Sequence, residues 1–231
     1  MKSLFEHAKS LIVHADTIID KANVHIDNAR EQIVAGLFNK ILNGANAIIL
    51  LCEKGYSVEA EIIVRSVLEA FFYMGACINS EDAIKNFLGK PLLEKIRAIG
   101  MAKRDPDAFN TEIREYLLSI ADNVKSQISE QNIMNLSAMK ASKLANAYDL
   151  YIVYMIQSDA IHSNPQHLQD TYMVHDENCI QQINIGPNPL KTEDALTALN
   201  IVLAMSCKLY RQLFKLAGES EVEKIERIYT H

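Results

Sequence analysis

Apolar residues recur at steps of three and four along most of the chain, which places them on one face of successive α-helices. The first stripe covers residues 3–22, and later stripes lie between capping residues and closing glycines or prolines. The pattern predicts further helices at about 27–54, 58–78, 81–88, from Pro91, from Asp105-Pro106 into the 120s, at 138–163, from Thr192 to before Gly218, and after Ser220.

One segment departs from this helical pattern, between Pro165 and Pro189. Residues 171–175 and 179–185 have the β-branched and aromatic composition of strands, which predicts a short hairpin or irregular excursion near 165–190. We therefore predict an all-α fold: a single-domain bundle of six to eight helices over residues 1–231. Its core is expected at about 27–217, with the N-terminal helix 3–22 and a C-terminal helix 220–229 at the periphery.

Composition narrows the function classes. The 231 residues have 23 Lys and Arg against 29 Asp and Glu, a formal net charge of −6, which argues against a broad nucleic-acid-binding face. No stretch approaches the roughly 18 consecutive apolar residues of a membrane span, so no membrane partner is expected. Three of the four cysteines, Cys52, Cys77 and Cys207, lie in apolar helical segments and indicate buried thiols in a reducing, cytoplasmic setting.

A cluster of polar residues closes the predicted helix 138–163. On a continuous helix, one side has Asn146, Asp149, Val153, Gln157 and Ala160 and is the expected outer face. The opposite, apolar side has Leu144, Tyr151, Met155, Ser158 and His162. A histidine there needs a hydrogen-bond partner, and Asp159 is adjacent. Two interpretations stay open: a structural histidine at a helix end, and a polar pocket built around His162.

A second polar row lies on the predicted helix 58–78. Glu61, Arg65, Glu69 and Tyr73 follow one another at steps of four. The row is either a solvated strip of weak ion pairs or, if the helix is central, an inward Arg–Glu pair that must be partnered. An Arg65–Glu69 pair that faces Ser158 and His162 across the bundle would form a compact ligand-binding or catalytic site.

These two segments carry a resemblance. Arg65-x3-Glu69, followed downstream by Tyr154-x3-Ser158-Asp159-x2-His162, resembles a bacterial all-helical family of unknown function, over about residues 35–215. That family is in turn distantly similar to the HEPN superfamily of helical bundles, found in prokaryotic ribonucleases, toxins and phage-defence proteins. The resemblance implies a helical bundle, a homodimer and polar residues at the dimer cleft. The Arg-x4–6-His segment of HEPN ribonucleases does not end at His162, because none of residues 155–158, which lie four to seven places before it, is arginine.

Other chemistries have weaker signals. Asp159-x2-His162 is one copy of the acid-x2-His step of di-iron bundles, which need two, so no metal site is predicted. Ser158 and His162 lack a nucleophile elbow, and neither a P-loop nor a dinucleotide fingerprint is present, so no cofactor is predicted.

Three hypotheses follow. The favoured one is a small anionic ligand or nucleotide in a polar pocket, with Arg65, Glu69, Tyr154, Ser158, Asp159 and His162 as ligand-binding residues; whether the chain is an enzyme stays open. In the second, the partner is RNA, with His162 as catalytic acid–base and Arg65 stabilising the charged transition state. In the third, the helix faces serve only dimerisation or another interaction.

Overall fold

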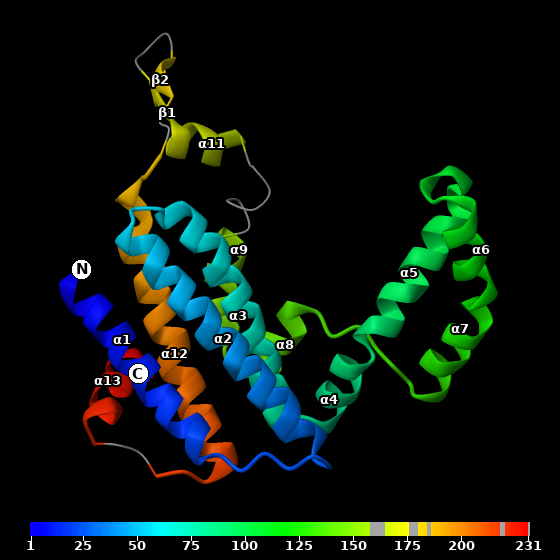
Figure 1. The fold of residues 1–231 in the computed structure, drawn as a ribbon, viewed down its shortest axis with the longest axis horizontal. Coiled ribbons are helices and arrows are strands. Elements are labelled where there is room, and N and C mark those ends of the chain that lie inside the picture. The colour runs from blue at the N-terminus through cyan, green and yellow to red at the C-terminus, as the bar shows by residue number, and fades with distance from the viewer. Residues whose placement is uncertain (158–164, 176–179, 184–185, 218–219, 231) are drawn as a thin grey trace.

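The computed structural model describes residues 1–157, 165–175, 180–183, 186–217 and 220–230. Four long helices form the main bundle: α1 (Lys2–Lys21), α2 (Ala29–Glu53), α3 (Ser57–Asn79) and α12 (Thr192–Phe214) (Figure 1). The turn between α2 and α3 is tight, and Gly55 adopts a φ of +80° there, a conformation that glycine accommodates without strain. The main hydrophobic core lies between these four helices.

The fold is all-α, as predicted, and the described residues form more helices than the six to eight expected. The remaining α-helices are α4 (Glu81–Leu88), α5 (Lys90–Arg104), α6 (Thr111–Ser119), α7 (Ala121–Glu130), α8 (Ala138–Leu144), α9 (Tyr148–Ile156), α11 (Pro165–Tyr172) and α13 (Ser220–Thr230). Two 3₁₀ turns, η1 (Pro106–Ala108) and η2 (Pro189–Lys191), and two strands, β1 (Met173–His175) and β2 (Ile180–Ile183), complete the described elements.

The main core is built mostly from α2, α3 and α12. Phe38 of α2 stacks on Tyr210 of α12, with the ring centres 4.3 Å apart. Cys52, Cys77 and Cys207 are buried, as predicted. Helix α1, expected at the periphery, packs along α12 and buries Leu11 in this core.

The sequence did not predict how apolar helix α2 is along its length. Among the described helices, it alone is long and apolar enough to cross a membrane by length and composition. In the fold, its Val34, Phe38 and Ile41 are buried, and the helix packs against α3 and α12.

The helix predicted at 138–163 is interrupted. Helix α8 ends in a Schellman motif, in which the Ala147 N–H bonds to the Ser142 carbonyl and the Asn146 N–H to the Lys143 carbonyl. Asn146 adopts the left-handed conformation, with φ +55°, and α9 begins afresh at Tyr148. Asparagine tolerates this conformation better than most residues, which is why the chain can break here without glycine.

The break invalidates the predicted assignment of faces, because the rotation angle does not carry across Asn146. Gln157, predicted on the outer face, is buried, whereas Met155, predicted to face inward, is 55% exposed. Leu144 is also exposed. The helix predicted from Asp105 into the 120s is likewise divided, into η1, α6 and α7, since Asp105 caps only the short η1 turn.

Helices α5, α6 and α7 project from the bundle as an arm (Figure 1). The arm has its own small hydrophobic cluster, formed by Ile99, Ala102, Leu117, Ala121 and Val124. The chain enters the arm at Gly89, which separates α4 from α5. The chain returns from the arm to the bundle near Ile133. A Cβ atom on Gly89 would overlap the Ile133 side chain, so the two chain segments that connect the arm to the bundle are in contact.

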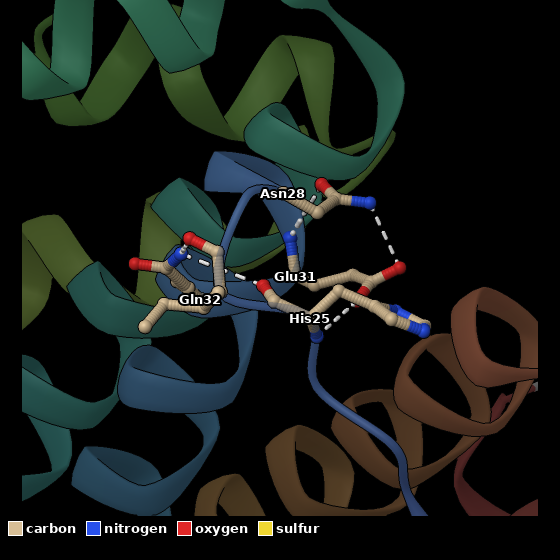
Figure 2. Close-up of polar contacts among 5 residues, drawn as sticks. His25, Asn28, Glu31 and Gln32 are labelled. Atoms are coloured by element: carbon tan, nitrogen blue, oxygen red, sulfur yellow. Dashed lines mark hydrogen bonds and ion pairs between the residues drawn. The ribbon is translucent and has the colours of Figure 1, made fainter.

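A hydrogen-bonded cluster fixes the start of α2, as Figure 2 shows. The cap is Asn28, whose Oδ1 accepts from the Glu31 N–H. The Glu31 carboxylate accepts from the Asn28 amide and from the His25 N–H, and also lies 2.8 Å from His25 Nδ1. Gln32 donates to the His25 and Ile26 carbonyls. This cluster links the α1–α2 loop to the first turn of α2.

The segment near 165–190 contains the predicted hairpin, with β1 antiparallel to β2 and Val174 opposite Gln182. Helix α11 precedes it, where no helix was expected. Next along the chain, Asn188 bridges to Tyr56, and its carbonyl accepts from the Ser57 hydroxyl. The Ser57 hydroxyl also accepts from the Lys191 N–H, so the first residue of α3 ties the beginning of this helix to η2.

Candidate functional site

The polar row on α3 is neither fully solvated nor fully buried. Glu61 and Tyr73, at its two ends, are 9% and 5% exposed, whereas Arg65 and Glu69 between them are partly exposed. Burial raises the pKa of Glu61 above its ordinary value; Lys191 opposes this shift and Asp194 adds to it. The row therefore runs along the boundary between the core and the surface of the bundle.

Arg65 and Tyr154 are brought together across the α3–α9 contact. The Arg65 Nη2 group donates to the Tyr154 hydroxyl at 2.8 Å, and the guanidinium carbon lies 4.2 Å from the centre of the same ring. Burial raises the pKa of Tyr154 and the Glu69 charge adds to that rise, whereas Arg65 lowers it. Three predicted site residues, Arg65, Glu69 and Tyr154, therefore share one electrostatic environment.

The other predicted site residues, Ser158, Asp159 and His162, lie outside the described residues. The roles of His162 and Arg65 in catalysis, and the juxtaposition of these two side chains, stay predictions from the sequence.

A cavity of about 330 Å³ opens beside Glu69, where the arm joins the bundle. We call it the Lys90 cavity. Its floor and walls are apolar and aromatic, while its charged groups are two lysines and two carboxylates. The lining residues are Leu37 and Lys40 of α2, Glu69, Ala70 and Tyr73 of α3, Phe87 of α4, and Lys90, Pro91 and Glu94 of α5.

Lys90 is the most constrained charged group of the cavity. Its Nζ lies 3.8 Å from the centre of the Tyr73 ring and 5.8 Å from that of Phe87. Burial lowers the pKa of the Lys90 ammonium; Glu69 and Glu94 oppose this, and Lys40 adds to it. The ammonium is therefore held over an aromatic face, in a position where its charge is poorly solvated.

Tyr73 forms the wall under this ammonium. Its hydroxyl donates to the Leu136 carbonyl at 3.2 Å, and its ring packs against Phe87 with centres 5.3 Å apart. Burial, followed by the nearby Glu69 charge, strongly raises the pKa of Tyr73. The hydroxyl thus stays protonated and fixed, which makes the ring a rigid surface for Lys90.

Sequence reasoning reached Glu69 and Tyr73 but missed Lys40, Lys90 and Glu94. These three come from α2 and α5, and only the packing of those helices brings them to α3. One local signal was present: Lys90 is the first residue of α5, where the positive end of the helix dipole disfavours a cation. A lysine in that position indicates a compensating environment.

Within the part of the chain that the structure describes, no group of three or more His, Cys, Asp or Glu side chains is arranged to hold a metal ion. The side chains that line the Lys90 cavity supply ammonium, carboxylate and aromatic groups. They can bind an anion, transfer protons through Glu69 or Glu94, and offer the Lys90 amine as a nucleophile.

Comparison with known proteins gives one match. None of the curated proteins and none of the solved structures matches the chain. The model of a family of unknown function, DUF5677, matches residues 31–180, which is more than half of the chain. The matched region contains every lining residue of the Lys90 cavity and the Arg65–Tyr154 pair. The chain therefore belongs to this family of unknown function, DUF5677.

Proposed function

We propose that this chain binds a small anionic ligand, bearing a carboxylate or a phosphate, in the Lys90 cavity. The observation that carries the proposal is the position of the Lys90 ammonium, half-buried over the Tyr73 ring in a cavity that Lys40 also lines. An anion that enters the cavity would supply the charge partner that desolvation makes favourable.

The two carboxylates of the cavity limit what the ligand can be. Glu69 and Glu94 offset the charges of Lys40 and Lys90, so a large polyanion would meet repulsion as well as attraction. A compact ligand with one anionic group near the lysines and a hydrogen-bond donor facing Glu69 is complementary to this pattern. The volume of about 330 Å³ is also at the small end of ligand sites.

The Arg65–Tyr154 pair supports this site from one helical turn away. Glu69 lies one turn after Arg65 on α3, and its charge acts on both Tyr73 and Tyr154. The pair fixes α9 against α3 beside Glu69. In this arrangement Arg65 is a positioning residue, and the ligand contacts come from Lys40, Lys90 and Glu69.

The test is thermal stabilisation by a panel of small anions: phosphate, glycolate, oxalate and adenosine monophosphate. A ligand that binds the folded chain at 100 times its Kd stabilises it by about 2.7 kcal/mol. We expect at least one anion to raise Tm in the wild type and to lose this effect in Lys90→Met and Lys40→Met.

Lys95→Met is the matched control, because Lys95 is an exposed lysine of the same helix that does not line the cavity. An equal loss of stabilisation in Lys95→Met, or no anion that stabilises the wild type, would contradict the proposal. A response only to adenosine monophosphate would narrow the ligand to nucleotides.

A further inference from the structure

We infer that Lys90 is a nucleophilic lysine, which forms an imine with a ligand that has an aldehyde or ketone next to its anionic group, as in a 2-oxo acid. The inference rests on the proposed function, because the anionic group is what would hold the carbonyl carbon near the amine. It adds a covalent step and a class of ligand to what the cavity alone indicates.

The geometry around Lys90 is the first argument. Its Nζ lies 3.8 Å from the centre of the Tyr73 ring and 5.8 Å from that of Phe87, and all three residues line the cavity, so the amine lies beside the space that a ligand would fill. Within the described residues, no carboxylate lies within ion-pair distance of Nζ, in contrast to Lys9, which pairs with Glu53 at 2.6 Å. An amine without a tight carboxylate partner needs to break no ion pair before it attacks.

The electrostatic environment is the second argument. Burial disfavours the charged ammonium, and the Lys40 and Arg97 charges act in the same direction. The N-terminus of α5, where Lys90 is the first residue, adds a positive potential. The carboxylates of Glu69 and Glu94 and the face of the Tyr73 ring oppose these effects. The direction that results is a lowered pKa, hence a larger share of neutral, nucleophilic amine near neutral pH.

The step balances with groups already in the cavity. The neutral Lys90 amine attacks the carbonyl carbon, a C–N bond forms, and one proton of the amine passes to the carbonyl oxygen to give a carbinolamine. An acid then protonates the hydroxyl group, which leaves as water while the nitrogen lone pair forms the C=N bond, and the remaining proton on nitrogen returns to the conjugate base of that acid. Glu69 lines the same cavity and can accept the proton from nitrogen and return it to the leaving oxygen. No oxidant or reductant is consumed in forming the imine.

The test is trapping of the imine in the full chain. Glyoxylate is the anionic aldehyde, sodium cyanoborohydride reduces the imine to a stable secondary amine, and peptide mapping gives the modification rate of each lysine. Near neutral pH we expect Lys90 to be modified several-fold faster than Lys95, because a lowered pKa enlarges the free-amine fraction of Lys90. The preference should disappear in urea, where both side chains are solvated.

Two variants separate this inference from the proposed function. Lys90→Arg keeps the positive charge but cannot form an imine, so glycolate should still stabilise it while glyoxylate trapping at this position is lost. Lys40→Met should slow trapping by glyoxylate more than trapping by uncharged acetaldehyde, which responds only to the loss of the Lys40 charge near Lys90. If anions stabilise the wild type but Lys90 reacts no faster than Lys95, the imine is wrong and the binding site stands. If neither effect is seen, both proposals fail.

Discussion

The guanidinium of Arg65 lies over the Tyr154 ring, 4.2 Å from its centre, and donates to the hydroxyl of the same side chain at 2.8 Å. This contact joins α3 to α9, which are 89 residues apart at these positions. It connects the polar row of α3 with α9, which lies in the predicted helix 138–163.

Tyr154→Phe keeps the ring under Arg65 and removes only the hydrogen bond. We expect it to lower the free energy of unfolding by about 1 kcal/mol, the usual net contribution of such a bond. Tyr151→Phe is the matched control, because this tyrosine stacks on Tyr154 from the same helix with ring centres 5.5 Å apart. Urea denaturation of both variants measures the difference, and equal losses would show that the Arg65–Tyr154 hydrogen bond contributes no net stability.

Gly75→Ala should destabilise the bundle. An added Cβ would lie 2.6 Å from the Cβ of Ala145 and 3.1 Å from its Cα, so α3 and the end of α8 would have to separate. We expect a loss of about 1–3 kcal/mol from this overpacking. Gly36→Ala in α2 has open space around the new methyl group and should instead be neutral or slightly stabilising. Thermal unfolding of the two variants tests the contrast, which a similar Tm in both would refute.

Glu61→Gln should change the dependence of stability on pH. Burial raises the pKa of Glu61 in the folded chain, so the folded state binds its proton more tightly than the unfolded state. The stability linked to that proton is present below the ordinary pKa of glutamate and is lost as pH rises through the raised value. Replacement by glutamine removes this loss, so the variant should gain stability relative to the wild type between acid and neutral pH.

The measurement is the free energy of unfolding of wild type and Glu61→Gln at several pH values, with the exposed Glu59→Gln of the same helix as control. A difference between wild type and Glu61→Gln that does not grow with pH would contradict the burial of a raised-pKa carboxyl.

Glu31→Gln should act in the opposite sense. The backbone N–H of His25, followed by its side chain, lowers the pKa of Glu31, so the carboxylate stabilises the fold above its ordinary pKa and ceases to do so as pH falls through the lowered value. We expect the variant to have a lower Tm than the wild type at about pH 7, and the difference to shrink as pH falls below the ordinary glutamate pKa. A difference in Tm that persists unchanged at acid pH would show that the carboxylate charge is not responsible.

Much of the fold could be predicted from local signals. Ser80 and Gly89 bound α4 as expected, because capping depends on neighbours within one turn. The break at Asn146 could not be recognised from composition, since asparagine is also common on exposed helix faces. Once that break was missed, the faces assigned to Met155 and Gln157 were wrong as well.

The candidate site likewise contains one part that local sequence signals predict and another part that depends on tertiary packing. The row Arg65–Glu69–Tyr73 follows from helical periodicity, which is a property of one segment. Lys40 and Lys90 reach it from two other helices, and the path of the chain through Gly89 that sets their approach depends on tertiary packing. Sequence alone therefore indicated Glu69, one of the four charged groups that line the cavity.

The junction at Gly89 has a mechanical consequence. Lys90 and Glu94 move with the arm, whose helices pack on their own hydrophobic cluster, whereas Lys40, Glu69 and Tyr73 belong to the bundle. The cavity thus lies between the arm and the bundle, which are connected by two chain segments that touch at Gly89 and Ile133. A molecule that contacts both walls would fix the orientation of the arm relative to the bundle. The angle between the arm and the bundle would then report whether the cavity is occupied.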